Sequence, residues 1–253
     1  MAESFGTDAG RYDRSRPSYP AALVERIVGA SPGPDVLDVG CGTGIAARLF
    51  TAAGCRVLGV DVDARMADVA RQHGLPVDVA RFEDWEPAGR TFDTVIAAQA
   101  WHWVDPVAGA ARAATVLRPG GRLAAFWNAF QPPDGLRAEF AAVYTRVLPG
   151  FPVPWARATG TELYASVASR TAEGMRAAGL LGEPEQWQFP WERPYTRDEF
   201  LDQMQTSGFQ GRTAPATMSD LLAGVGAAID AAGGSFVMGY TTVAVTAARA
   251  EAG

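Results

Sequence analysis

Residues 36–44, VLDVGCGTG, decide the fold of this chain. The segment begins as a short apolar strand and runs directly into three alternating glycines, Gly40, Gly42 and Gly44, after which a helical pattern of apolar residues opens. A strand that ends in a glycine turn and continues as a helix gathers free backbone N–H groups and the positive end of a helix at one place. Glycine suits such a turn because it accepts positive φ values and lets a ligand approach the backbone. The segment therefore predicts a ligand-binding βα turn.

A second apolar strand, RVLGV at 56–60, follows this turn and ends at Asp61. An acid at the tip of the strand beside a glycine turn is placed to hold a ribose diol. Strand, glycines, helix and distant acid occur in the order that a nucleotide-type ligand requires. We interpret the glycine turn and Asp61 as two parts of one binding site.

Strand and helix patterns alternate up to residue 128. Apolar runs at 77–80, 92–98 and 122–127 are separated by helical patterns. This alternation predicts a parallel sheet with helices on its faces. The later elements are expected as helices near 135–148, up to 180, at 196–207 and at 216–232, and as strands at 187–196 and 236–248.

The glycine segment resembles motif I of the class I S-adenosylmethionine-dependent methyltransferases. The glycines are spaced GxGxG instead of the GxGxxG of dinucleotide enzymes, and an acid, Asp38, stands two residues before the first glycine. The strand FDTVIAA at 92–98 and the turn LRPGG at 117–121 are also similar to this family. The resemblance implies a Rossmann-like, doubly wound α/β fold with a mostly parallel seven-stranded sheet, an antiparallel last strand and a helical cap.

The resemblance assigns cofactor-binding roles along the first half of the chain. Asp38 is expected to help hold the methionine end of S-adenosylmethionine, and Asp61 to bind both ribose hydroxyls. After the third strand, Phe82 is expected to cover the adenine ring and Glu83 to stand near its amino group; Phe82 also fits a structural role at the sheet edge. The expected cofactor site is completed by Arg16, as partner of the cofactor carboxylate, and by Gly40, Cys41, Gly42, Gly44, Val62, Ala98 and Gln99.

The segment QAWHWVDP at 99–106 follows the carboxyl end of a central strand, where doubly wound sheets bind ligands. Aromatic faces attract a sulfonium as they attract other cations. His102 is the histidine nearest the predicted site, so it fits either a general base or a residue that holds the loop by hydrogen bonds. We predict a substrate pocket that contains Tyr12, Trp101, His102, Trp103, Trp127 and Asn128.

Residues 1–30 are expected to form an N-terminal lid and a helix. Tyr12, Arg16 and Tyr19 recur at near-helical spacing, which favours a shared face, although a surface arm that merely packs is the alternative. Residues 31–128 are predicted to form the cofactor-binding core. Residues 129–253 are predicted to complete the same α/β domain, with helical cap insertions at about 129–180 and 196–232.

Length, charge and composition argue against nucleic-acid-binding, membrane-spanning and metal-binding classes of protein. The 253 residues suffice for one large α/β domain. With 22 basic and 28 acidic residues the net charge is −6, and no run of arginines suggests a nucleic-acid partner. The sequence contains no apolar stretch long enough to span a membrane, no cluster with metal-ligand spacing and only two separated cysteines. These features favour a cytoplasmic protein with reduced thiols.

The predicted function is transfer of a methyl group from S-adenosylmethionine to an O, N or C atom of a small-molecule metabolite. The reaction is an in-line displacement, for which alignment of the reactants supplies much of the rate. A non-catalytic S-adenosylmethionine-binding protein, with the cap as a partner surface, is the alternative. A nicotinamide dehydrogenase fits less well because of the glycine spacing and Asp38.

Overall fold

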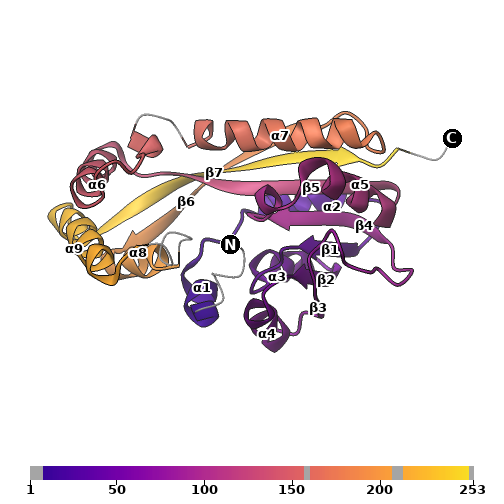
Figure 1. The fold of residues 1–253 in the computed structure, drawn as a ribbon, viewed down its shortest axis with the longest axis horizontal. Coiled ribbons are helices and arrows are strands. Elements are labelled where there is room, and N and C mark those ends of the chain that lie inside the picture. Colours follow the sequence, from indigo (N-terminus) through magenta and orange to yellow (C-terminus); the bar gives the residue numbers. More distant parts are fainter. Residues whose placement is uncertain (1–7, 157–159, 207–212, 251–253) are drawn as a thin grey trace.

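The computed structural model describes residues 8–156, 160–206 and 213–250 (Figure 1). A seven-stranded sheet forms the centre of the molecule, in the order β3-β2-β1-β4-β5-β7-β6. The strands are β1 (Asp35–Val39), β2 (Arg56–Asp61), β3 (Val77–Val79), β4 (Phe92–Ala98), β5 (Leu117–Gln131), β6 (Glu185–Thr196) and β7 (Ser235–Ala248). All strands run parallel except β7, which pairs antiparallel with both β5 and β6. The predicted fold class is confirmed.

The helices follow the predicted order. None of those described combines the length and the apolar character that crossing a bilayer requires. They are α1 (Ala9–Ser15), α2 (Ala21–Gly29), α3 (Ile45–Ala52), α4 (Ala64–Gln72), α5 (Pro106–Val116), α6 (Asp134–Val147), α7 (Glu162–Ala178), α8 (Arg197–Met204) and α9 (Pro215–Ala231), with short 3-10 turns η2 (Trp101–Trp103) and η3 (Pro154–Ala156).

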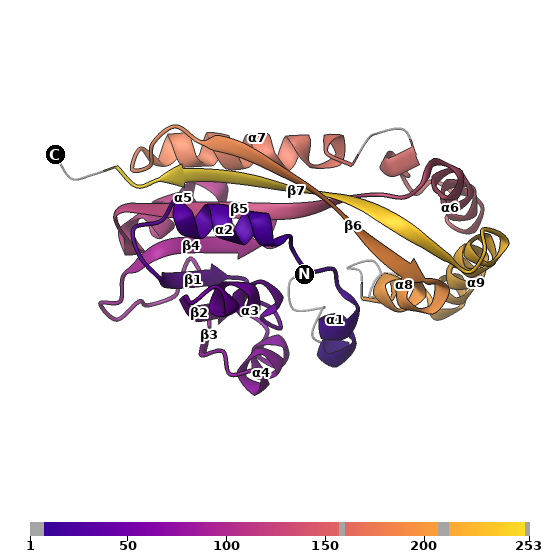
Figure 2. The same ribbon diagram turned by 180° about the vertical axis from the view of Figure 1, so that it is seen from behind.

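Helices cover both faces of the sheet because neighbouring residues of each central strand point to opposite sides. In β1, Leu37 and Val39 pack with α5 and α7, whereas Val36 packs with α2, α3 and α4. Figure 2 shows α2 in front of the sheet, and the opposite view shows α5 and α7 on the other side. The strand order reverses between β2-β1 and β1-β4, so the end of β1 lies at the point where ligands of such sheets bind.

A third apolar cluster lies beyond the end of the sheet and forms a cap. The helices α6, α8 and α9 gather there around the outer halves of β6 and β7 (Figure 1). Phe140 of α6, Val225 of α9 and Tyr195 of β6 are all buried within this cluster. The cap is thus built directly on long strands that continue out of the central sheet.

The predicted extent of the cap needs one correction. The segment 129–180 was expected to belong to the cap, but its longest helix, α7, packs against α5, β5 and β7 and covers a face of the sheet. Gly174 permits this packing, because a Cβ there would overlap the backbone carbonyl of Pro106 at the start of α5. Among the described residues of this segment, α6 and the turn η3 are the elements that belong to the cap.

Candidate active site

The glycine turn connects β1 to α3 in a conformation that requires glycine. Gly40, Gly42 and Gly44 have φ values of +68°, +54° and +83°. A Cβ on Gly40 would lie 2.5 Å from the Cβ of Ala100, so the position also lacks room for a side chain. The Gly40 N–H donates to the carbonyl of Val60 at 2.8 Å, which fixes the turn against the neighbouring strand.

Asp61 at the end of β2 points toward this turn. One carboxylate oxygen accepts a hydrogen bond from the backbone N–H of Gly42 at 2.7 Å, and the other accepts from the N–H of Asp63 at 2.8 Å. Burial raises the pKa of Asp61, and the backbone N–H groups partly offset this effect. A carboxylate offers about four acceptor positions. Asp61 therefore retains capacity for the hydroxyl groups of a ligand.

Two cavities meet at the glycine turn. The first, which we name the strand-edge cavity, has a volume of about 500 Å³ and lies against the ends of β2 and β3. The second, the cap cavity, has a volume of about 320 Å³ and extends under the cap. Residues that line both are Tyr12, Arg16, Gly40, Gly42, Ala98 and Gln99. A ligand in one cavity can thus meet a ligand in the other at this junction.

The predicted cofactor residues are distributed between these cavities. Asp61, Val62, Phe82 and Glu83 line the strand-edge cavity, and Cys41 lines the cap cavity. Phe82 is also packed against Trp85 and Trp101, so it both lines the cavity and contributes to the core. Asp38 and Gly44 line neither cavity. Asp38 is completely buried in β1 beside the turn, and Gly44 caps α3.

Gln99 forms the junction between the cavities. Its φ of +58° is unusual for a residue other than glycine, and such strain is commonly found at functional sites. Its side-chain oxygen accepts from the Asn128 N–H at 3.0 Å, and its side-chain nitrogen donates to the Tyr164 hydroxyl at 2.8 Å. The backbone N–H donates to the carbonyl of Phe126 at 2.8 Å. These contacts hold one side chain in a defined position between β4, β5 and α7.

The N-terminal segment converges on the same junction. Tyr12 lies on α1, Arg16 ends this helix, and Tyr19 follows in extended chain, yet all three line the cap cavity. The Arg16 guanidinium lies 4.9 Å from the centre of the Tyr12 ring and donates to the carbonyl of Thr206 at 2.8 Å. The Nε of Arg16 is buried and has no hydrogen-bond partner among the described residues. The three side chains line one cavity but do not share the expected helical face, because Tyr19 lies beyond the end of α1.

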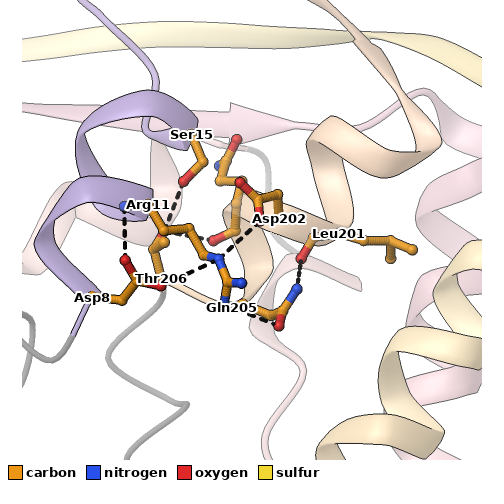
Figure 3. A network of polar contacts seen from close by, with 8 residues as sticks. Asp8, Arg11, Ser15, Leu201, Asp202, Gln205 and Thr206 are labelled. Carbon is orange, nitrogen blue, oxygen red and sulfur yellow. Dashed lines mark hydrogen bonds and ion pairs between the residues drawn. The ribbon is translucent and has the colours of Figure 1, made fainter.

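Polar contacts hold α1 between the cap and the core (Figure 3). On the cap side, Arg11 forms an ion pair of 3.0 Å with Asp202, and the Ser15 hydroxyl donates to Thr206 at 3.4 Å. On the core side, Asp13 forms an ion pair of 2.8 Å with Arg48 of α3. The α1 segment therefore connects two parts of the molecule that lie far apart in the sequence.

The structure differs from the predicted substrate pocket at two positions, Trp101 and Trp127. Trp101 and Trp127 are almost completely buried, and neither lines either cavity, because both pack in the core beneath α5 and α7. His102 and Trp103 line the strand-edge cavity instead of the cap cavity. Tyr12 and Asn128 do line the cap cavity.

Of the two roles considered for His102, general base or residue that holds the loop, the geometry favours the second. Its Nδ1 accepts a hydrogen bond from the Trp127 indole N–H at 3.3 Å, so this lone pair is already engaged. Burial lowers the pKa of His102, and Arg170 lowers it further. A neutral imidazole that accepts at Nδ1 carries its proton on Nε2. These contacts match the alternative role, in which His102 fixes the loop.

Sequence reasoning missed most of the cap cavity. Tyr164 was not predicted although it binds Gln99, and neither were the aromatic residues of α6 and α8 that line the cavity. Their apolar helical spacing was visible, but it does not distinguish a cavity wall from a core. The described residues contain no group of three or more His, Cys, Asp or Glu side chains suited to a metal ion.

Comparison with known proteins identifies related sequences. Residues 37–125 match a family model described as a methyltransferase domain. The chain is 42% identical over 131 residues to an uncharacterised methyltransferase of Mycobacterium tuberculosis, which covers 51% of this chain and 53% of the relative. It is 33% identical over 135 residues to the demethylmenaquinone methyltransferase of Tropheryma whipplei, with 49% and 54% covered. The chain spans about half the length of the curated relatives it matches.

A solved structure extends the similarity of the fold beyond this half. A candidate type II methyltransferase of Anaeromyxobacter dehalogenans matches with a TM-score of 0.62 at 23% identity. The match covers 94% of this chain and 99% of the other. A fold similar to that of almost the whole chain is therefore found in a solved structure.

Proposed function

We propose that the chain is a class I S-adenosylmethionine-dependent methyltransferase, which transfers a methyl group from this cofactor to a small-molecule metabolite. The observation that carries the proposal is the junction of two cavities at the glycine turn. One cavity offers the carboxylate of Asp61, and the other extends under the cap. A transferase needs such adjoining sites because donor and acceptor must meet in alignment.

The residues around the turn fit the cofactor. Both carboxylate oxygens of Asp38 are buried and lack a hydrogen-bond partner of normal geometry among the described residues, as does the Nε of Arg16. Buried groups of this kind are normally paired. A ligand that carries both a cationic amino group and a carboxylate supplies partners of opposite sign for the two side chains. The methionine end of S-adenosylmethionine is such a ligand.

Each residue then has a distinct task. Asp38 and Arg16 would hold the methionine end, Asp61 the ribose hydroxyls, and Phe82 and Glu83 the adenine. When bound, S-adenosylmethionine supplies a methyl group on a positively charged sulfur, and its transfer leaves S-adenosylhomocysteine. The remaining contribution of the chain is to align the acceptor and exclude water, for which α1 and the cap are suitably placed.

The acceptor is proposed to be a small molecule that offers an O, N or C atom. The cap cavity, at about 320 Å³, is within the size range of small-molecule sites. The relative from Tropheryma whipplei is named for methylation of demethylmenaquinone, which supports a metabolite as the acceptor. We further propose a cytoplasmic location, because Cys41 and Cys55 are both free and buried.

Transfer of label from S-adenosylmethionine tests this proposal. The protein is incubated with methyl-labelled cofactor and a low-molecular-mass metabolite extract, and label is followed into small molecules other than the cofactor. We expect transfer by the wild type and by Asp68→Ala, whose exposed carboxylate on α4 pairs only with Arg71 among the described residues. Asp61→Ala should lose transfer. Cofactor binding without transfer in any extract would favour the non-catalytic alternative.

A further inference from the structure

The walls of the cap cavity come from almost every element of the cap. Phe140 and Tyr144 lie on α6, Phe200 and Gln203 on α8, and Tyr240 on β7. The rings of Phe140 and Phe200 stack at 5.5 Å with an interplanar angle of 11°, and Trp155 meets Tyr144 edge-on at 4.9 Å. These rings form a broad apolar surface. Flat faces of this kind favour contact with another ring.

Charge is nearly absent from this cavity. Among the described residues that line it, Arg16 carries the one formal charge, and it lies at the junction with the glycine turn. An ionised group moved from water into such surroundings loses solvation without gaining a partner. An acceptor with a carboxylate, phosphate or ammonium group is therefore disfavoured inside the cap cavity.

The cavity also lacks a general base. No Asp, Glu or His is found among its described lining residues. Burial raises the pKa of Tyr164 and Tyr240, and that of Tyr144 to about 12, so these hydroxyls stay protonated at neutral pH. An acceptor atom that needs the protein to remove its proton finds no suitable partner here.

On the cap side of the cavity, Gln203 places an amide group among the aromatic rings. The side chain of Gln203 lies near the Tyr240 hydroxyl and partly offsets the rise that burial causes in the pKa of this group, and the same hydroxyl lies 2.8 Å from that of Tyr195. The Oε1 of Gln203 is buried and has no hydrogen-bond partner among the described residues. A buried acceptor without a donor costs free energy that a ligand can recover. The missing partner is an N–H or O–H group.

We propose that the methyl acceptor is an uncharged, ring-bearing apolar compound whose N–H or O–H group donates a hydrogen bond to Gln203. This inference rests on the proposed function, since it concerns the second substrate of that reaction. Gln203 orients the acceptor and selects for the donor group, and it removes no proton. The hydroxyl pair of Tyr195 and Tyr240 lies beside this amide.

Equilibrium dialysis on protein saturated with S-adenosylhomocysteine tests the proposal. Saturation fills the proposed cofactor site, so the probes cannot bind there. The probes are 2-naphthol, 2-methoxynaphthalene, which lacks the donor, and 6-hydroxy-2-naphthoate, which adds a charge. We expect 2-naphthol to bind about tenfold more tightly than either of the others. Gln203→Leu should remove the preference for 2-naphthol over the methoxy compound, while Gln188→Leu, at an exposed position of β6, should keep it.

Failure of the proposed function and failure of the inference about the acceptor give different results. If S-adenosylhomocysteine does not saturate the protein, the proposed function is wrong, and the inference that rests on it is wrong as well. If it does, the inference is overturned by carboxylate binding at least as tight as that of 2-naphthol, by an unchanged preference in Gln203→Leu, or by no binding of either uncharged probe. An unaltered affinity of Gln203→Leu for S-adenosylhomocysteine confirms that the variant is folded.

Discussion

Asp38 and Asp61 are electrostatically coupled across the base of the glycine turn. Burial and the neighbouring charge of Asp61 raise the pKa of Asp38 from 3.8 to about 7, although the backbone N–H of Ala47 acts in the opposite direction. Neither acid has a cationic side chain as hydrogen-bond or ion-pair partner among the described residues. Two acids placed so close to each other leave the turn prepared for a cationic ligand.

This coupling predicts that cofactor binding releases a proton. The raised pKa means that Asp38 is largely protonated at about pH 6.5 without ligand. A cationic amino group beside it favours the ionised form and lowers the pKa, so up to about one proton leaves on binding. Affinity should therefore fall as the pH drops below about 7, by at most about tenfold per pH unit.

Calorimetry in buffers of different ionisation enthalpy measures this proton. We expect the binding enthalpy of S-adenosylhomocysteine to depend on the buffer for the wild type and for Asp68→Asn, and to lose most of this dependence in Asp38→Asn. Equal proton release in the wild type and Asp38→Asn would assign the proton to another group and contradict the proposed role.

The contacts of α1 predict a measurable change in local stability. Asp202→Asn removes the ion pair with Arg11 that joins α1 to α8. Both side chains are partly exposed, so we expect a loss well below 1 kcal/mol. Amide hydrogen exchange over residues 9–15 should become up to about threefold faster, while exchange in α7 stays the same.

The matched control for this measurement is Asp198→Asn, whose carboxylate on the same helix is 87% exposed and pairs with Arg197. Exchange in α1 should not respond to this change. If Asp202→Asn also left the exchange of α1 unaltered, α1 would not be held to the cap through this ion pair.

The glycine turn packs so closely on β2 that a methyl group added at Gly59 should lower the free energy of unfolding. A Cβ there would lie 2.6 Å from the Sγ of Cys41 and 3.1 Å from its Cβ. We expect Gly59→Ala to lower the free energy of unfolding by about 1–3 kcal/mol, measured by urea denaturation. Adding Cys41→Ala should recover part of this loss because it removes the nearer atom. Gly135→Ala, where a Cβ meets no atom within 4 Å, should cost nothing.

The sequence predicted those parts of the site that are formed locally. The glycine turn, the acid at the end of β2 and the residues after β3 each follow directly from a strand, so their positions could be inferred from order and spacing alone. The N-terminal caps of α4 and α5 are equally local, since Asp63 and Asp105 accept backbone hydrogen bonds from the helices that they precede.

The parts that depend on long-range packing were not predictable. Trp127 was expected in the pocket because it ends a strand, but the strand continues to Gln131 and the indole turns into the core. Tyr164 reaches Gln99 only because α7 lies across the sheet, 65 residues further along the chain. Periodicity cannot specify such contacts, since they depend on which face of a helix meets which strand.

A calorimetric titration with S-adenosylhomocysteine tests the central claim most directly, namely that the glycine turn and Asp61 hold the cofactor. The account predicts saturable one-to-one binding by the wild type and by Asp68→Ala, and an affinity about ten- to a hundredfold weaker for Asp61→Ala, since hydrogen bonds to a charged group are lost. No binding by folded wild-type protein, or equal affinity in Asp61→Ala, would contradict it.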